Sequence, residues 1–381
     1  DRIIFFLISF NKKKDFKILK KIILESEGVQ NGRITEIEKV SKLIKKTINK
    51  IEEEINYFFS EATIIINPNQ INCLNVSGYK KLNGSKVLNE DITYILNDIK
   101  KIILDSENNY SLVHLFNSNF SLDSDNLENL PIGLFGEFYN QNMTFFLTNK
   151  NVLKNIKSVF NNCGLNIEKL ILKPFAEGIN LLTNVHTDKN FTILKLEKNR
   201  INISLFKNKS FVFFEDFDFG LDLIIKDISK LCSLKVEEVE NFIKETELSK
   251  TDELYLEKKF FYTSPFRQIK YQLILEIIIA RLEELFEICY QKNTNIKNLK
   301  SDGKIFVYVE APQYYKNLNY ILEKNKFTTP ECIFDCSTQQ NMVSGAVGAS
   351  ELIGKGWEKE AVPIIKKNKS LISGFFSKLF N

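Results

Sequence analysis

The clearest chemical pattern in the sequence lies in its last dozen residues, where six apolar side chains recur at helical spacing. They are Leu371, Ile372, Phe375, Phe376, Leu379 and Phe380. On a helix these side chains form one continuous stripe, opposite Ser373, Ser377 and Lys378. Three further lysines, Lys366, Lys367 and Lys369, come just before the stripe. An apolar helical face with lysines beside it is suited to the interface of an anionic membrane, so Lys378 and the six apolar residues are candidate membrane-binding residues.

Two interpretations of this tail remain open: a membrane-binding helix, or a helix docked on its own domain. An isolated helix this short is only marginally stable in water, so it needs a surface on which to fold. Gly354, Gly356 and Pro363 separate it from the last globular segment, which favours a tethered helix. Burial of a large apolar side chain contributes roughly 1.5–3 kcal/mol. With only partial burial, a single tail is expected to bind a membrane reversibly.

Side chains suited to catalysis are scarce. The sequence has no P-loop signature, no cysteine–histidine pairing and only two histidines, His114 and His186. His114 stands in an apolar, strand-like segment, which favours a structural role over a ligand role. Cys332 and Cys336 are the only close pair of cysteines, and no second pair completes a zinc site. We therefore expect no catalytic residues and no metal site.

Composition is that of an ordinary soluble protein with room for two or more domains, at 381 residues and 26% charged residues. The net charge of +4 is too small to indicate a nucleic-acid partner, and scattered cysteines suggest reduced thiols in the cytoplasm. No apolar run approaches the roughly 20 residues that span a bilayer. The segment Ile3–Phe10 is followed by lysines, so it is interpreted as a buried strand. Because the chain starts at Asp1 and not at Met, we expect that an upstream segment has been removed or is not included in this sequence.

Hydrophobic periodicity predicts alternating strands and helices. Strands are expected at 3–10, 16–23, 62–67, 114–122, 143–147 and 170–172, and helices at 36–57, 89–104, 152–162 and 174–182. From Phe191 the pattern restarts with a meander at 191–196, 200–207 and 210–215, helices at 221–231, 236–246, 268–291 and 344–353, and a buried strand at 304–309. Two α/β halves that each open on a meander indicate an internal duplication.

The sequence resembles the FtsA family, actin-like bacterial division proteins that tether the tubulin-like FtsZ to the membrane. The resemblance rests on short matches in a consistent order and on the amphipathic tail. These matches are Gly28–Ile34, Asn89–Ile92, Phe120–Asp123, Pro131–Gly136, Asn162–Ile167, Glu276–Leu285 and Ser344–Gly348. It implies an α/β, actin-like fold of the duplicated ribonuclease H-like type, with two lobes and an inserted α+β subdomain.

The resemblance also implies a division of the chain. The first lobe would be 1–72 and 165–187, with its N-terminal strand truncated, and the inserted subdomain would be 73–164. The second lobe would be 188–353, with a small subdomain at about 225–290. A linker at 354–369 and the membrane-targeting helix at 370–381 would complete the chain.

The nucleotide motifs of the family are not kept. In the family, the second phosphate loop is rich in glycine, because glycine lets backbone amides approach phosphate closely. The corresponding segment here, Lys195–Arg200, contains no glycine. The glycine pair on the adenosine side, near Tyr308–Pro312, is also absent. Lys195 replaces the acid that would help to hold Mg²⁺, and the first phosphate loop would lie upstream of Asp1. We expect weakened or absent binding of ATP and Mg²⁺ and no enzymatic activity.

Two explanations of this change remain open. Either the chain no longer binds ATP, or it binds ATP through the side chains of Lys195, Lys198 and Arg200. Gly220 still follows the family pattern, and Lys244 corresponds to a nucleotide-contacting lysine. The plainer interpretation, which we favour, is that Lys198 belongs to an ordinary hairpin turn with solvated lysines.

The resemblance implies a non-enzymatic adaptor on the cytoplasmic side of the cell membrane, at the division site. Its partners would be the C-terminal peptide of FtsZ, anionic lipids, later division proteins and further copies of itself in actin-like filaments, but no nucleic acid. The alternative functions are an actin-fold scaffold of a pilus or secretion platform and an ATPase with an unusual site.

In the family, the FtsZ peptide is held by the small subdomain of the second lobe. The matching helix carries Arg281 and Glu284, one turn apart. An arginine can bind a peptide carboxylate through two parallel hydrogen bonds. The alternative is an intrahelical ion pair of Arg281 with Glu284 or Glu276, worth only a few tenths of a kcal/mol.

Overall fold

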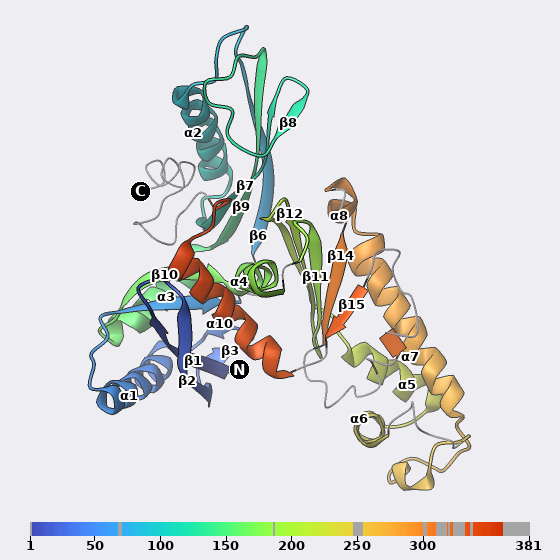
Figure 1. Cartoon of the computed structure of the whole chain (residues 1–381). Helices are drawn as coiled ribbons and strands as arrows, with labels where there is room; N and C mark the ends of the chain where they lie inside the picture. The colour runs from blue at the N-terminus through green and yellow to red at the C-terminus, as the bar shows by residue number, and fades with distance from the viewer. Residues whose placement is uncertain are drawn as a thin grey trace. The chain divides into compact units, whose positions relative to one another are not determined.

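The computed structural model describes residues 2–67, 71–185, 187–246, 254–299, 303–309, 318, 321–322, 332–335 and 338–360. The chain divides into two compact units (Figure 1). Unit 1 contains the chain up to Lys189, residues 206–213 and the segment from Ser344, whereas unit 2 contains residues 190–205 and 214–343.

Unit 1 holds two separate pairs of long strands. Strands β1 (Arg2–Phe10) and β2 (Phe16–Glu25) form an antiparallel hairpin, and β5 (Glu61–Ile66) pairs in parallel with β10 (Asn166–Leu172). A small hairpin of β3 (Val29–Gln30) and β4 (Arg33–Ile34) leads into helix α1 (Ile37–Ile55). The turn between β2 and β3 requires glycine, because Gly28 has a φ of +90°.

Helices α1 and α3 (Lys150–Asn162) cover the β1–β2 hairpin. Val40 and Ile44 of α1 pack with Val159 of α3, and Ile3 and Phe5 of β1 join this cluster. The apolar positions of α1 recur at intervals of three and four residues, so one face of the helix is buried. The other helices of this unit include α4 (Lys173–Asn180), followed by a π-helical turn, and the part of α10 (Thr338–Lys355) that starts at Ser344.

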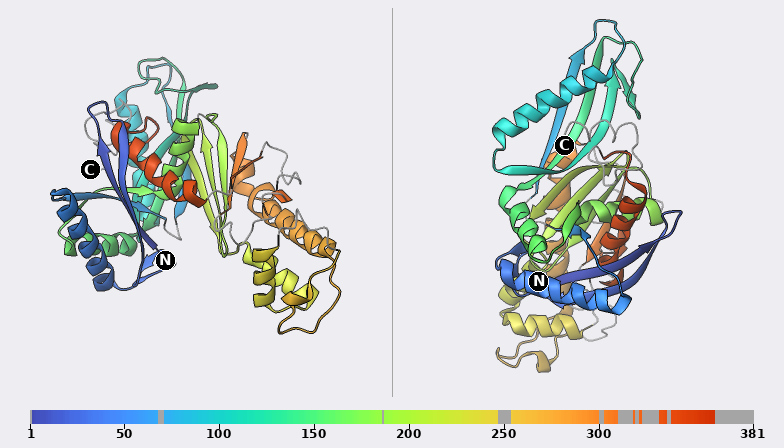
Figure 2. Two further views of the ribbon diagram at one scale, coloured as in Figure 1. Left: turned by 60° about the horizontal axis from the view of Figure 1, so that its bottom comes forward. Right: turned by 90° about the vertical axis from the view of Figure 1, so that its left-hand side faces the viewer.

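A four-stranded antiparallel sheet forms a second core within unit 1. Its order is β6 (Asn72–Lys81), β9 (Phe138–Asn149), β7 (Tyr110–Leu122) and β8 (Asp125–Leu127). Helix α2 (Asn89–Ser106) lies across these strands (Figure 2). Its residues Ile92, Ile95 and Ile99 pack against Phe120 and Phe145 of the sheet. The segment at 72–149 therefore has a hydrophobic core of its own.

Unit 2 is built on a five-stranded sheet. Its order is β13 (Ser210–Phe217), β12 (Ile201–Lys207), β11 (Phe191–Leu196), β14 (Lys304–Val309) and β15 (Cys332–Asp335). Strand β14 runs parallel to both β11 and β15. Every residue of β11 is buried, as expected for a central strand with both faces covered. The helices of this unit are α5 (Asp222–Cys232), α6 (Val236–Glu245), α7 (Tyr271–Phe286) and the short α8 (Thr294–Asn298).

The tip of the β12–β13 hairpin carries phenylalanines that belong to the core of unit 1. Phe211 stacks on Phe146 with ring centroids 4.3 Å apart and on Phe206 at 5.0 Å. Phe175 of α4 lies edge-on to Phe116 at 4.7 Å. Five aromatic rings thus share one cluster, which buries a large apolar area.

Most predicted elements occur within a few residues of their expected positions, including the meander from Phe191 and both halves of the β1–β2 hairpin. Strands β6, β8 and β15 were not predicted. Helix α7 begins at Tyr271 rather than at residue 268, and α10 begins at Thr338 rather than at Ser344. Within the described ranges, no helix combines the length and apolar character needed to cross a bilayer.

Candidate functional site

The turn between β11 and β12 is the place where the resemblance expects phosphate contacts. The Glu197 amide donates to the Arg200 carbonyl at 2.9 Å, which closes the hairpin. Gly220 lies against the turn: a Cβ added there would be 2.5 Å from the Glu197 carbonyl oxygen. Leu221 then donates its backbone N–H to the Glu197 carbonyl at 3.0 Å, and Asp222 donates to Lys198 at 2.8 Å. The first amides of α5 are therefore bonded to the turn itself.

The basic side chains of this hairpin have partners within unit 2. Lys198 Nζ is 2.9 Å from Glu240 on α6, and Arg200 is 2.7 Å from Asp216 and 3.2 Å from Asp218. Lys195 stands within β11 and is only 5% exposed. The structure thus brings Lys198 and Arg200 into ion pairs with acids of the same unit.

These contacts do not fit a phosphate group bound at the β11–β12 turn. A phosphate site needs backbone N–H groups that point at the ligand, and here the amides of Leu221 and Asp222 are used by carbonyl groups. The turn also contributes the negative charge of Glu197. Lys244 lies at the end of α6, another element of unit 2. We derive no nucleotide chemistry from this turn.

The predicted peptide site on α7 has a different arrangement. Arg281 Nε is 2.5 Å from Asp227 of α5, and its Nη1 also forms an ion pair with Glu284. The hydrogen bond that Arg281 donates to Asp227 raises the pKa of the Arg281 guanidinium above its ordinary value. Both acids are half-buried or exposed, so they compete with any carboxylate that approaches Arg281.

A buried hydrogen-bonded pair of side chains connects β7 to the segment that follows α10. His114 Nδ1 contacts Glu360 Oε1, and His114 Nε2 accepts the Leu172 N–H at 3.1 Å. Because Nε2 accepts, the proton of the neutral ring lies on Nδ1 and is donated to Glu360. Burial raises the pKa of the Glu360 carboxyl, and His114 partly offsets this effect. Glu360 Oε2 has no hydrogen-bond partner among the described residues.

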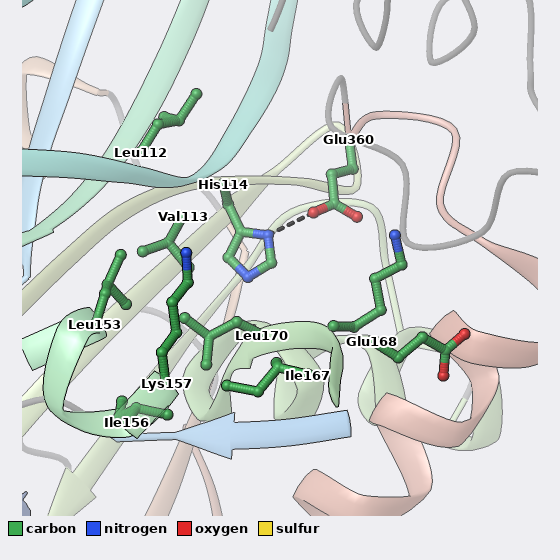
Figure 3. A pocket seen from close by; sticks show the side chains of 11 residues that line it. Leu112, Val113, His114, Leu153, Ile156, Lys157, Ile167, Glu168, Leu170 and Glu360 are labelled. Carbon is green, nitrogen blue, oxygen red and sulfur yellow. Dashed lines mark hydrogen bonds and ion pairs between the residues drawn. The ribbon is translucent and has the colours of Figure 1, made fainter. Parts of the chain in front are cut away.

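This pair lines a cavity of about 250 Å³ in unit 1. Figure 3 shows the dashed contact between His114 and Glu360 beside apolar side chains of α3 and β10. Three further hydrogen bonds fasten the same segment. Trp357 Nε1 donates to the Lys209 carbonyl at 2.9 Å, the Asn117 N–H donates to the Lys359 carbonyl at 3.0 Å, and Lys359 Nζ donates to the Glu128 carbonyl at 2.9 Å. The pair and these hydrogen bonds together hold residues 357–360 in place.

Several predicted features lie outside the described residues. They are the membrane-binding residues Leu371, Ile372, Phe375, Phe376, Lys378, Leu379 and Phe380, together with His186, Cys336 and the stretch 310–312. Among the residues that are described, no group of three or more His, Cys, Asp or Glu side chains is arranged to hold a metal ion.

Sequence reasoning anticipated the ion pair of Arg281 with Glu284 but missed the partners that lie far along the chain. Asp227 lies 54 positions from Arg281, and Glu360 lies 246 positions from His114. No periodicity connects residues so far apart in the chain.

Comparison with known proteins gives FtsA proteins among the curated relatives. The chain is 20% identical over 293 residues to the cell division protein FtsA of Buchnera aphidicola subsp. Schizaphis graminum, covering 76% of this chain and 70% of that protein. It is 21% identical over 267 residues to FtsA of Neisseria meningitidis, covering 69% and 64%. No protein-family model matches the sequence.

Among solved structures, the type IV pilus biogenesis complex PilM–PilN matches with a TM-score of 0.56 at 10% identity, covering 93% of this chain and 95% of that one. A likeness at this identity shows the fold alone. The fold is the α/β, actin-like fold that the sequence resemblance implied.

Proposed function

We propose that this chain, a divergent relative of the FtsA proteins with an actin-like fold, is a cell-division adaptor that tethers FtsZ polymers to the cytoplasmic face of the membrane. The observation that carries the proposal is the similarity to curated FtsA proteins over about three quarters of the chain, at 76% coverage for one relative. The adaptor itself assembles into actin-like filaments at the septum and recruits later division proteins.

The membrane end of the adaptor is the tail at 370–381. Its six apolar side chains and Lys378 enter the lipid interface, and the preceding lysines each add about 1 kcal/mol on anionic lipid. Such an anchor is weak when single, but filaments present many tails at a high effective concentration. Self-assembly and membrane binding therefore strengthen each other.

The FtsZ end of the adaptor is the helical part of unit 2. Capture of the peptide carboxylates at Arg281 requires an exchange with Asp227 or Glu284, whose contacts with Arg281 are already made. Because this exchange opposes binding, we propose that Arg281 contributes only modestly to the affinity for the FtsZ peptide and that other groups of unit 2 also contact the peptide.

Nucleotide has at most a weakened role in this proposal. The β11–β12 turn is closed by its own hydrogen bonds, and Lys198 and Arg200 are engaged by acids. The chain is therefore proposed to act without ATP turnover, with Gly220 and Lys244 serving the fold of unit 2.

The test is co-sedimentation of purified FtsZ with anionic liposomes, with the full chain and with a version that ends at Lys369. We expect the full chain to bring FtsZ down and the shortened chain to lose this effect. Binding of the protein to liposomes without recruitment of FtsZ would contradict the adaptor function and favour a pilus or secretion scaffold. Failure to bind liposomes at all would contradict the membrane role of the tail.

A further inference from the structure

The two long strand pairs of unit 1 each leave one strand edge open. Among the described residues, β1 pairs only with β2, and β5 pairs only with β10. The opposite edges of β1 and β5 therefore carry backbone N–H and C=O groups that belong to no ladder in this part of the chain. Because such groups are costly when they are shielded from water, the two edges are candidate pairing sites.

The side chains of β1 are those of an interior strand. From Ile3 to Phe10 this strand has no charged residue and no proline. Its neighbour β2 carries Lys17, Lys20 and Lys21. Natural sheets protect their outer edges with charged residues, especially lysine. The lysines thus mark β2 as an outer strand and β1 as a strand suited to neighbours on both sides.

The parallel pair shows the same contrast. After Glu61, strand β5 contains only uncharged residues and ends in three isoleucines. Strand β10 carries Glu168 and Lys169 near its middle. By the same reasoning, β10 is an outer strand and β5 an interior strand.

Neither β1 nor β5 is buried as an interior strand should be. None of the nine residues of β1 is fully buried, and in β5 only Ile66 is. In unit 2, by contrast, every residue of β11 is buried. Covering the remaining apolar surface of β1 and β5 would be favourable. The sequences of these strands therefore fit a more complete sheet than the two separate pairs.

Both strand pairs pack on the same helix. Val159 of α3 shares a hydrophobic cluster with Ile3 and Phe5 of β1, and α3 also packs against β10. The β1–β2 and β5–β10 pairs are therefore parts of one layer that α3 covers.

The sheet of unit 2 shows how two such pairs are joined. It contains the β12–β13 hairpin and the parallel pair of β14 and β15, and β11 lies between them (Figure 1). Strand β11 runs parallel to β14 and enters β12 through the turn that the Glu197 amide closes on Arg200. Unit 1 has a hairpin and then a parallel pair in the same chain order, but its described residues include no counterpart of β11.

We propose that a further strand lies between β1 and β5, antiparallel to β1 and parallel to β5, and that a segment of the same polypeptide ahead of Arg2 supplies it. The β11–β12 turn is the reason for this source, because a strand antiparallel to β1 reaches the start of β1 through an equally short turn. The inserted strand is apolar throughout, since both of its faces are covered, and six residues long, like β5 and β11. It joins the two pairs into one five-stranded sheet.

A second copy of the chain fits these edges less well. Pairing between the β1 strands of two copies would satisfy one edge and leave the edge of β5 open, whereas one inserted strand satisfies both. The inference goes beyond the proposed function, because it requires neither FtsZ nor lipid. Its outcome is therefore independent of the liposome assay.

The experiment compares the full chain with a version that is extended ahead of Asp1 by a designed strand, Val-Thr-Ile-Leu-Val-Leu, and an Asn-Gly turn, which favours a two-residue hairpin. Hydrogen exchange followed by mass spectrometry measures the protection of backbone amides. We expect exchange in both β1 and β5 to slow by at least about tenfold, because insertion pairs the open edge of each strand. Exchange in β12, which already has two neighbours, should not change.

The matched control extension has proline at its third and fifth positions, where proline cannot donate to a ladder. It should leave exchange as it is in the chain without an extension. A second extension that copies residues 191–196 of β11 guards against a poor choice of sequence.

Three outcomes would overturn the proposal. The first is no protection with either strand extension, or equal protection with the proline control. The second is protection of β1 without β5, since the extension would then only prolong the hairpin. The third is a dimer of the unextended chain, detected by light scattering, that the extensions leave intact and in which β1 is already protected, because a second copy would then occupy the edge.

Discussion

The pair of His114 and Glu360 shows how much can depend on two residues. Both side chains are buried, and together they hold the segment that leads to the tail against β7. A buried carboxylate adds little net stability even when a partner donates to it, but removal of that partner leaves the charge without compensation and costs about 3–5 kcal/mol. The importance of the pair therefore lies in where it fixes the chain.

We predict that His114→Ala lowers the free energy of unfolding by about 3–5 kcal/mol at pH 7. Because burial raises the pKa of Glu360, its protonated form is favoured in the folded state. The folded state therefore binds this proton more tightly than the unfolded state does. The resulting contribution to stability is fully present below about pH 4.5, the ordinary pKa of a glutamate, and is lost as the pH rises through the raised pKa. The loss of unfolding free energy in His114→Ala should therefore be smaller at pH 4.5 than at pH 7, as measured by urea unfolding at both pH values.

The control for this prediction is the double variant His114→Ala/Glu360→Gln, which removes the buried charge. It should recover part of the stability at pH 7. An equal loss for His114→Ala at pH 7 and pH 4.5 would show that packing, and not the charge of Glu360, sets the effect.

At the scale of the elements, the contact between α10 and α4 depends on a glycine. A Cβ added at Gly348 would lie 1.7 Å from the Ala176 carbonyl oxygen, a backbone atom that cannot move aside alone. At Gly345, one turn earlier, the nearest atom would be 3.5 Å away, in the flexible side chain of Lys173. The two glycines on one helix thus have different roles.

We predict that Gly348→Ala destabilises the protein by at least about 1–3 kcal/mol, because the helices must separate. Gly345→Ala should be neutral or stabilising by up to about 1 kcal/mol, since alanine favours helix. Thermal unfolding of both variants measures the difference. Similar melting temperatures would mean that α10 shifts on α4 without strain.

Helix α1 and strand β6 differ in how well their sequences predict them. Helix α1 was predictable because one face repeats apolar residues at helical intervals. Strand β6 was not, because only Leu74 and Val76 mark its inner face before Gly78 interrupts the apolar pattern. That glycine lies beneath α2, where a Cβ would be 2.3 Å from Ile95, so the helix supplies the packing that the strand lacks.

The candidate sites were less predictable than the fold. The sequence identified Arg281 and Glu284 as neighbours on a helix, and the ion pair between them follows from their spacing. The ion pair of Arg281 with Asp227 depends on how α5 packs on α7, and that of Lys198 with Glu240 depends on how the hairpin meets α6. Tertiary packing creates such pairs, and local patterns do not encode them.

At the scale of the whole molecule, the proposed function places different tasks on different parts of the chain. In that proposal the tail would bind lipid, the helical part of unit 2 would bind peptide, and we further propose that the segment at 72–149 would mediate self-assembly. This segment exposes large apolar side chains: Tyr79 and Phe135 are both 73% exposed, and Leu134 is 52% exposed. Exposed apolar residues on a body with its own core are suited to contact another copy.

We predict that Leu134→Ser/Phe135→Ser abolishes filaments on a lipid monolayer while single molecules remain bound through the tail. The reason is that the contact between copies loses its apolar surface, whereas the buried core of the segment is untouched. Electron microscopy of negatively stained monolayers at high coverage measures the outcome. Phe58→Ser is the control, because Phe58 is 84% exposed but lies outside this segment. If filaments persist in the double variant, or disappear in Phe58→Ser alone, the self-assembly surface lies elsewhere on unit 1.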